Sequence, residues 1–272
     1  MGKMSNLSAM RAFEDQVMQL TRTKLAQLFD STLLVSYATE TEIIKLCRDA
    51  LRQGFHSVCV NPFWVHLSSS IVLEKLSVCS VVGFPLGANK LETKLKETEL
   101  AIDDGANEID FVLNICALKE SKFDVIQKEV AQFVETSKHG GNERGIEVTT
   151  KLILETYLFL HVDREDRLAI NKDILRRACY LAAEAKIDFV KTCTGFDTGA
   201  GKSFVTPDDV AFLKSVVGQT TMVKASGGIR TLSQVIELVR SGASRIGTSS
   251  AASIMEEFDS KQVPSIPISV QS

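Results

Sequence analysis

Short apolar runs rich in β-branched residues alternate along the chain with longer segments that have helical periodicity. Most positions within each run are apolar, as expected for strands of a parallel sheet that helices cover. The strand-like runs span residues 27–31, 57–61, 77–84, 108–114, 148–155, 188–192, 222–226 and 245–249. Helix-like segments between them span residues 40–54, 91–105, 123–137, 172–185 and 232–242. This alternation predicts an α/β fold with a parallel sheet.

Eight such units in one chain of 272 residues are what a (β/α)8 TIM barrel requires. We therefore predict a single barrel domain over residues 1–272, with an N-terminal helix and arm at 1–26 and a loose polar tail at 259–272. The extra helix, at about residues 7–25, is amphipathic and precedes the first strand. An open doubly wound sheet is the rival fold, but it normally carries GxGxxG after its first strand, and this sequence has none there.

Composition narrows the classes of partner. The chain is 44% hydrophobic and 24% charged, with a net charge of −3, which gives no electrostatic reason to expect nucleic acid or an anionic membrane. No apolar run reaches the roughly 18 residues of a membrane span, and the N-terminus lacks the apolar core of a secretory signal. We expect a cytoplasmic protein that binds neither nucleic acid nor membrane.

Cysteine and histidine spacing does not indicate a metal site. None of the six cysteines forms a CxxC pair, and the four histidines are scattered. We therefore expect reduced, mostly packed thiols, no metal and no other cofactor.

Charged residues interrupt four of the apolar strands: Asp110, Lys151, Lys191 and Lys224. In a barrel, the C-terminal strand ends form the active site. Lys191 and Lys224 occupy equivalent positions on neighbouring strands, which lie about 4.8 Å apart. Like-charge repulsion and burial both lower the pKa of a lysine, and a neutral amine attacks carbonyls. The pattern favours Schiff-base catalysis with Asp110 as proton carrier, directly or through water. The alternative is a purely structural salt-bridge network of Asp110 with Lys151 or Lys224.

Two glycine-containing loops indicate an anion site. Residues 226–231 (SGGIRT) follow the seventh strand and residues 247–250 (GTSS) follow the eighth, each before a helix. Backbone N–H groups and helix N-termini in such loops bind phosphate, and barrels of this class often bind it there.

The segment around Gly201-Lys202-Ser203 superficially resembles a nucleotide-binding loop. The P-loop pattern GxxxxGK[ST] requires glycine at position 196, where this chain has Phe196. In addition, Thr206 and Pro207 are typical of a helix start, which places Lys202 in the preceding loop. We do not expect ATP or GTP binding.

Seven motifs, in order from about Asp30 to Ser253, resemble the deoxyribose-phosphate aldolase family. They are SVCVNPFWV, VVGFPLGAN, GANEIDFVLNICALK, KLILET, DFVKTCTGF, VKASGGIRT and GASRIGTSS. The resemblance implies a (β/α)8 class I aldolase of deoxyribonucleotide and carbohydrate catabolism. Such a lyase cleaves 2-deoxy-D-ribose 5-phosphate to D-glyceraldehyde 3-phosphate and acetaldehyde without metal.

The resemblance also implies roles for individual residues. Lys191 would form the Schiff base, Lys224 would favour its neutral form through like-charge repulsion, and Asp110 would relay protons through water. The expected substrate- and phosphate-binding residues are Gly227, Gly228, Arg230, Gly247, Ser249, Ser250, Thr194, Asp30 and Cys59.

The chain departs from the family pattern at three places. Residues 30–36 read DSTLLVS, where the family usually has Asp-His-Thr-x-Leu-Lys-Pro. The segments 137–147 and 196–206 look longer than the corresponding loops of the family pattern. The C-terminal tail lacks the tyrosine with which longer family members end.

The altered first strand and the missing tyrosine motivate one alternative, a divergent aldolase-like protein that mainly binds another protein. A further alternative keeps the barrel but changes the reaction to that of another phosphosugar lyase or isomerase. A homodimer is one expected assembly, and a protein partner is expected only under the divergent alternative.

Overall fold

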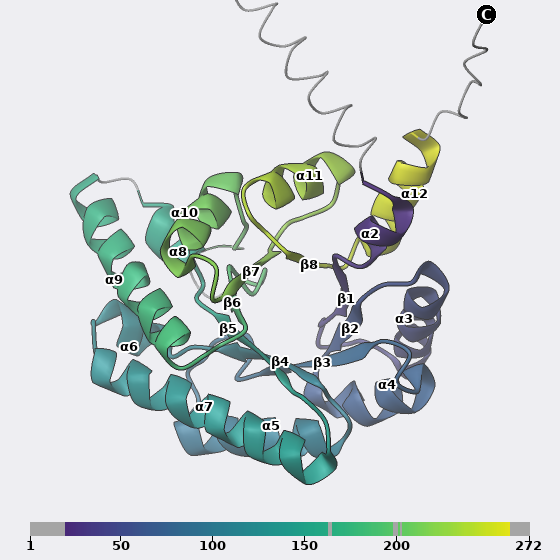
Figure 1. The fold of residues 1–272 in the computed structure, drawn as a ribbon, viewed down its shortest axis with the longest axis horizontal. Helices are drawn as coiled ribbons and strands as arrows, with labels where there is room; N and C mark the ends of the chain where they lie inside the picture. The colour runs from purple at the N-terminus through teal and green to yellow at the C-terminus, as the bar shows by residue number, and fades with distance from the viewer. Residues whose placement is uncertain (1–19, 163–164, 198–200, 202, 262–272) are drawn as a thin grey trace, which may run out of the picture.

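The computed structural model describes residues 20–162, 165–197, 201 and 203–261. Within these residues, eight parallel strands form a closed barrel in sequence order, and β1 pairs with both β2 and β8 (Figure 1). The predicted (β/α)8 barrel is therefore confirmed. The strands are β1 (Phe29–Leu33), β2 (Ser57–Val60), β3 (Ser77–Val82), β4 (Glu108–Val112), β5 (Thr149–Ile153), β6 (Phe189–Lys191), β7 (Met222–Ser226) and β8 (Arg245–Thr248).

Helices surround the barrel and connect each strand to the next. They are α2 (Arg22–Ala26), α3 (Glu40–Gln53), η1 (Pro62–Trp64), α4 (Val65–Val72), α5 (Leu91–Asp103), α6 (Ile115–Lys119), α7 (Phe123–Arg144), α8 (Tyr157–Leu160), α9 (Glu165–Glu184), α10 (Pro207–Val217), α11 (Leu232–Arg240) and α12 (Ala251–Lys261). None of the helices in the described ranges is long and apolar enough to cross a bilayer.

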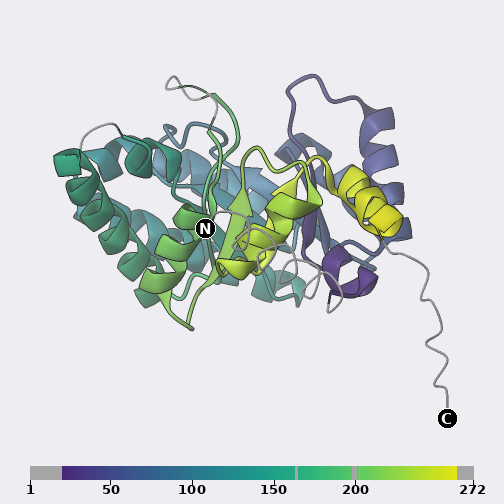
Figure 2. The same cartoon turned by 90° about the horizontal axis from the view of Figure 1, so that it is seen from above.

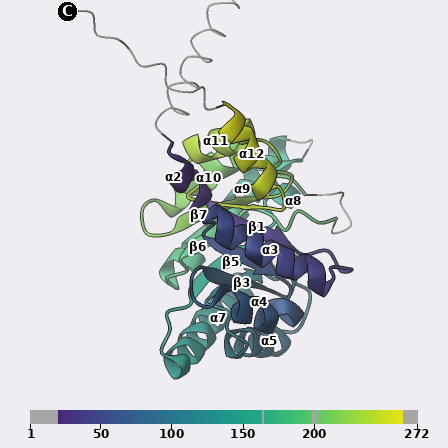
Figure 3. The same ribbon diagram turned by 90° about the vertical axis from the view of Figure 1, so that its right-hand side faces the viewer.

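The first and last described helices close the ring beside each other. Figures 2 and 3 show α2, α3 and α12 on the same side of the molecule. Arg22 of α2 pairs with Asp259 of α12 at 3.1 Å. The described part of the predicted 7–25 helix is the short α2, which the side chain of Thr21 caps; residues 1–19 lie outside the described residues. Helix α12 continues through Lys261, into the segment predicted as a tail, and residues 262–272 are not described.

Helix α7 corrects one sequence expectation. Residues 137–147, which look like an extended loop by comparison with the family pattern, are helical through Arg144. A Cβ on Gly140 would lie 3.3 Å from the Ile102 side chain, and one on Gly141 would lie 2.7 Å from the Ile146 carbonyl oxygen. The glycines thus permit close packing of α7 against α5 and against its own C-terminal connection.

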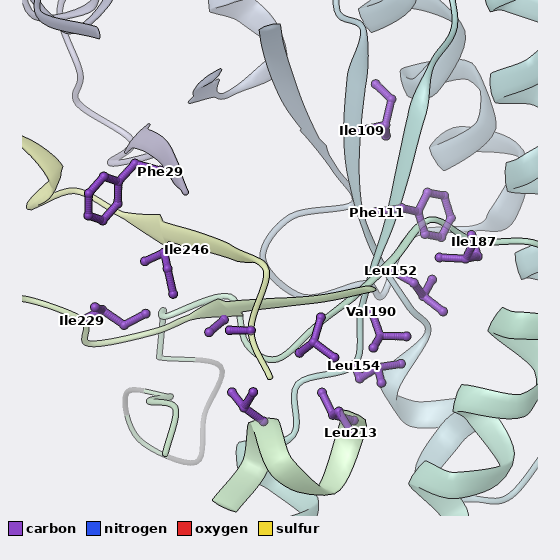
Figure 4. Close-up of a cluster of buried hydrophobic side chains, with 14 of the residues drawn as sticks. Phe29, Ile109, Phe111, Leu152, Leu154, Ile187, Val190, Leu213, Ile229 and Ile246 are labelled. Atoms are coloured by element: carbon purple, nitrogen blue, oxygen red, sulfur yellow. The ribbon is translucent and has the colours of Figure 1, made fainter. Parts of the chain in front are cut away.

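Each strand separates an outer apolar layer from the barrel interior. In Figure 4, Phe29, Phe111, Leu152, Val190 and Ile246 lie among the apolar side chains packed between strands and helices. Burying a large apolar side chain contributes about 1.5–3 kcal/mol, so this layer stabilises the barrel from outside. Strand β4 shows the alternation. Ile109 and Phe111 belong to the apolar core, whereas the alternate residues Glu108 and Asp110 join the ion pairs of the interior.

A buried ion pair shapes the turn after β3. Lys94 and Glu129 pair in the core, and the Lys94 Nζ donates to the carbonyl oxygens of Gly87 at 3.2 Å and Val112 at 3.0 Å. Gly87 has φ +64°, and a Cβ there would lie 2.1 Å from the Leu113 carbonyl oxygen. The turn between β3 and α5 is therefore fixed against the end of β4.

Candidate active site

Charged side chains fill the barrel interior where small barrels usually carry apolar layers. Within the described residues, ion pairs connect seven of them: Asp30, Glu108, Asp110, Lys151, Lys191, Lys224 and Arg245. Their side chains are at most 8% exposed. Charges this deeply buried are tolerated only when partners compensate them. Three carboxylates here face four basic groups.

Asp110 connects the three lysines. Its Oδ1 lies 2.9 Å from Lys151 Nζ, and its Oδ2 lies 2.6 Å from Lys191 Nζ and 2.7 Å from Lys224 Nζ. Strand register accounts for this convergence, because Asp110 is level with Lys151 and Lys191 is level with Lys224. The structure thus brings together the three residues predicted to be catalytic, and it also contains the ion-pair network proposed as the alternative.

Further ion pairs extend below Asp110. Asp30 lies 2.5 Å from Lys224 Nζ and 2.7 Å from an Arg245 nitrogen. Glu108 lies 2.7 Å from Lys151 Nζ and also contacts Arg245 at 3.1 Å. Lys191 differs from the other basic groups, because Asp110 is the single carboxylate that pairs with it among the described residues.

The charge network determines which groups stay ionised. Burial opposes ionisation of Asp110, but the surrounding lysines outweigh it and hold the Asp110 pKa well below its usual range. Burial likewise opposes ionisation of Glu108, but Lys151 and Arg245 help to lower the Glu108 pKa to about 2. All three lysines therefore face carboxylates that remain charged at neutral pH.

The prediction that burial and like charge lower the pKa of the paired lysines is wrong for Lys224. Burial does lower the Lys224 pKa, but Asp110 and Asp30 together raise it above the ordinary lysine value. The pKa of Lys151 is raised in the same way, because Asp110 and neighbouring groups outweigh burial. The sequence indicates that Lys224 is buried and close to another lysine, but it does not show that Asp110 and Asp30 both lie beside Lys224. Lys224 and Lys151 are thus permanent cations near Lys191.

A cavity of about 380 Å³ opens above the network at the C-terminal strand ends. Lys191 is the lysine of the network that lines it. Other predicted residues on its wall are Thr194, Gly227, Gly228, Arg230, Gly247 and Ser249. The cavity therefore joins the candidate nucleophile to both glycine loops.

The remaining predicted residues lie elsewhere. Asp110, Lys224 and Asp30 are buried beneath the cavity within the network. Cys59 is buried in a small apolar cluster, and the Ser250 backbone N–H donates to Thr248 Oγ1 at 2.9 Å instead of facing the cavity. Lys202, considered for the nucleotide-binding loop, lies outside the described residues.

The loop after β7 has the backbone geometry of an anion cradle. Gly227 has φ +110° and Gly228 has φ +73°, both in the region that favours glycine. A Cβ on Gly227 would lie 3.2 Å from the Phe204 Cα, because the segment before α10 packs directly behind the loop. Helix α11 begins just beyond, with its first turn capped by Thr231, so its N-terminus is at the same edge of the cavity.

Phe196 lines the cavity and packs against Phe84, whose ring lies near Lys191. Phe84 and Phe196 pack edge to face with centroids 5.1 Å apart, and Lys191 Nζ lies 6.0 Å from the Phe84 centroid. Such apolar walls exclude water and strengthen electrostatic interactions within the site.

Glu108 and Arg245 were not singled out from the sequence. Each is the first residue of its strand, and charged residues are ordinary at strand ends. The available signal was the spacing of Glu108, two residues before Asp110, which places both side chains on one face of β4.

In the part of the chain that the structure describes, two groups of side chains have ligand atoms close enough for a metal ion: Cys59, Cys79 and Asp110, and Asp30, Cys79 and Glu108. Each carboxylate in these groups already pairs with a buried lysine or arginine. The negative charge that would attract a cation is thus already offset, and the geometry fits lysine chemistry better than metal chemistry.

Comparison with known proteins agrees with this geometry. A family model described as DeoC/LacD family aldolase matches residues 18–254. The chain belongs to the DeoC/LacD aldolase family. Its relatives include the deoxyribose-phosphate aldolase of Thermococcus kodakarensis, which is 42% identical over 240 residues, or 87% of this chain and 98% of the relative. The Geobacillus enzyme of the same name is 41% identical over 233 residues, or 85% and 95% of the two chains.

Solved aldolases share the three-dimensional fold. The tetrameric deoxyribose phosphate aldolase of Aeropyrum pernix superposes with a TM-score of 0.77 at 32% identity, covering 90% of this chain and 96% of that one. An aldolase named QR15 superposes with a TM-score of 0.75 at 36% identity, covering 87% and 96%. The barrel and its charged interior therefore belong to an aldolase-type lyase.

Proposed function

We propose that this chain is a class I aldolase that cleaves 2-deoxy-D-ribose 5-phosphate to D-glyceraldehyde 3-phosphate and acetaldehyde. The observation that carries the proposal is the position of Lys191. It lines the cavity, whereas Lys151 and Lys224 are completely buried in ion pairs beneath it. The names of the relatives supply the substrate, and the anion cradle at the other end of the cavity supports a phosphorylated one.

Charge balance supports Lys191 as the nucleophile. Four basic groups face three carboxylates, so loss of one proton from the network leaves it balanced. Lys151 and Lys224 are held as cations by two or more carboxylates each, and an arginine does not release its proton. Lys191 has a single carboxylate partner and lines the cavity, so it is the basic group of the network that is placed to act as the nucleophile.

In the proposed reaction the neutral Lys191 Nζ attacks the substrate aldehyde carbon, and water leaves as the Schiff base forms. The C2–C3 bond then breaks, its electrons move toward the imine, and the 3-hydroxyl proton is removed. D-Glyceraldehyde 3-phosphate departs, the remaining enamine is protonated at C2, and water releases acetaldehyde. Asp110 is placed to hold and return these protons, since its Oδ2 lies 2.6 Å from Lys191 Nζ.

The opposite end of the cavity would bind the phosphate. Gly227, Gly228 and Ser249 lie on its wall, together with the Arg230 side chain, which can donate charge-assisted hydrogen bonds. The N-terminus of α11 adds a favourable dipole. A bound phosphate would set the distance at which the aldehyde carbon meets Lys191.

The aldolase reading is favoured over the divergent protein-binding alternative, since relatives covering most of the chain are named as aldolases. A cytoplasmic location, a catabolic role and a homodimeric assembly are proposed with it. Light scattering after size exclusion tests the assembly, and the tetrameric Aeropyrum pernix structure makes a tetramer the competing outcome.

Borohydride trapping tests the function directly. Reduction during turnover of deoxyribose 5-phosphate should leave an ethyl group on Lys191, mapped by peptide mass. The matched variant Lys191→Arg keeps the positive charge but should remain unmodified. An unlabelled wild-type protein, or labelling that persists in Lys191→Arg, contradicts the proposal. Trapping by a different phosphosugar alone would assign the chain to another lyase.

A further inference from the structure

Two thiols face each other inside the barrel, beside the proposed proton carrier. Cys59 on β2 and Cys79 on β3 are register partners on neighbouring parallel strands, and both are completely buried. Their sulfur atoms and an Asp110 oxygen all lie within 4.8 Å of one another. Neighbouring strands are about 4.7–4.9 Å apart, which falls within the Cα separation of roughly 4.4–6.8 Å found across disulfides.

The two thiols differ in their tendency to ionise. The neighbouring Cys79 thiol lowers the pKa of Cys59, and the cations Lys224 and Lys191 act in the same direction, against burial and the Asp110 carboxylate. Burial raises the Cys79 pKa well above its usual value. Cys59 is thus the more acidic thiol of the pair and suits attack on an oxidant, whereas Cys79 suits the resolving role.

The proposed active-site cavity provides a route to the pair. Cys59 and Cys79 pack with Leu34 and Val81, and the Phe196 side chain packs against this cluster. Leu34 and Phe196 also line the cavity. Leu34 and Phe196 thus connect the cavity wall to the thiol cluster, and a small uncharged oxidant that enters the cavity would reach the sulfur atoms past these two side chains.

We propose that Cys59 and Cys79 form a site of reversible oxidation by a hydroperoxide such as hydrogen peroxide. The Cys59 sulfur attacks one peroxide oxygen, the O–O bond breaks, and the proton of the Cys59 thiol passes to the leaving hydroxide, which departs as water. Cys59 is then a sulfenic acid. The Cys79 sulfur attacks the Cys59 sulfur, the S–O bond breaks and a second water departs. Two electrons pass from the thiols to the peroxide, and a disulfide links β2 to β3.

The disulfide would disturb the charge network. The Cys79 thiol donates to Asp110 Oδ1 at 3.2 Å, and its sulfur lies 3.2 Å from Lys151 Nζ. A bond of about 2.05 Å to Cys59 draws that sulfur away and leaves no proton to donate. Asp110 then loses one of the contacts that fix it beside Lys191. The covalent chemistry is independent of the proposed function, whereas the effect on activity rests on it.

Peptide mapping and activity, measured in parallel on the full chain, test the proposal. The background carries Cys116→Ser, because Cys116 is exposed and would form links between molecules. After hydrogen peroxide treatment, alkylation and non-reducing digestion, we expect the peptides containing Cys59 and Cys79 to be joined, with a mass lower by two hydrogens. Aldolase activity should fall by on the order of 10²-fold, the cost of a misplaced catalytic group, and dithiothreitol should restore it.

Two variants serve as controls, each compared with its own untreated activity. Cys79→Ala removes the resolving thiol, so Cys59 should oxidise without a link and dithiothreitol should not restore activity after prolonged treatment. Cys179→Ala should behave like the background, because burial raises the Cys179 pKa to about 12 and it lies on α9, away from the pair.

Two results would overturn the inference. One is the absence of the linked peptide at a peroxide dose that oxidises Cys116 in the wild-type chain. The other is a stoichiometric link that leaves activity unchanged, which would remove the proposed effect on Asp110. Because the link is read by mass, a chain without aldolase activity would still test the covalent step.

Discussion

Replacing Lys191 by methionine separates catalytic from structural roles within the charged interior. Methionine matches the length of the lysine stem but carries no charge. The change leaves three basic groups facing three carboxylates, and Asp110 keeps Lys151 at 2.9 Å and Lys224 at 2.7 Å. Asp110→Asn is the matched perturbation, because it leaves four basic groups facing two carboxylates.

The two variants should differ in stability by several kcal/mol. Removing one partner of a buried pair and leaving charge uncompensated costs about 3–5 kcal/mol, which we expect for Asp110→Asn. Lys191→Met leaves no excess charge, so the free energy of unfolding should stay within about 1 kcal/mol of wild type or rise. At roughly 2–4 °C per kcal/mol, Asp110→Asn should lower Tm by about 10 °C.

Urea unfolding and steady-state kinetics on the same preparations provide the measurement. Both variants should lose kcat/KM for deoxyribose 5-phosphate by about 10³-fold or more, the scale seen when a nucleophile or its proton-transfer partner is removed. Equal activity losses with unequal urea midpoints are the expected signature. If Lys191→Met were destabilised as much as Asp110→Asn, Lys191 would be a structural ion-pair partner. If it kept its activity, the nucleophile would be elsewhere.

Arg230→Met should raise KM for deoxyribose 5-phosphate by about 10–100-fold, because it removes one to two hydrogen bonds to a charged group. The same variant should leave kcat/KM for unphosphorylated deoxyribose unchanged. An equal loss on both substrates would place Arg230 outside the phosphate site. Because the folded-state pKa of Glu108 is about 2 against an ordinary 4.5, its contribution to stability should be complete above pH 4.5 and lost as pH falls toward 2. Urea midpoints measured from pH 6 to 3 report this loss of stability. The Glu108→Gln variant should be less stable than wild type at pH 6, and its urea midpoint should fall less steeply as pH decreases. Gly87→Ala should destabilise the fold by more than about 2 kcal/mol, because its Cβ would lie 2.1 Å from a carbonyl oxygen. Gly54→Ala, also at positive φ but with no atom within 4 Å, should cost only about 1 kcal/mol in the same urea titration.

Much of the barrel could be predicted because strand and helix periodicities are local properties. Asp110, Lys191 and Lys224 stood out because a charged residue inside an apolar strand is conspicuous. The state of Lys224 could not be predicted, since it depends on carboxylates from β1 and β4 that only the closed barrel brings together. The helix predicted to end at residue 137 continues through Arg144, because Gly140 and Gly141 allow close packing that depends on Ile102 and the Ile146 carbonyl group.

The alternation along β4 also constrains how this gene can change over evolution. Ile109 and Phe111 face the helices, whereas Glu108 and Asp110 face the charged interior of the barrel. Substitutions can alter one face and spare the other. An insertion or deletion of a single codon within the strand exchanges the two faces together, placing carboxylates under the helices and rings among the lysines. Length variation among descendants of this sequence should therefore collect in the loops, and the central strands should differ by substitution alone.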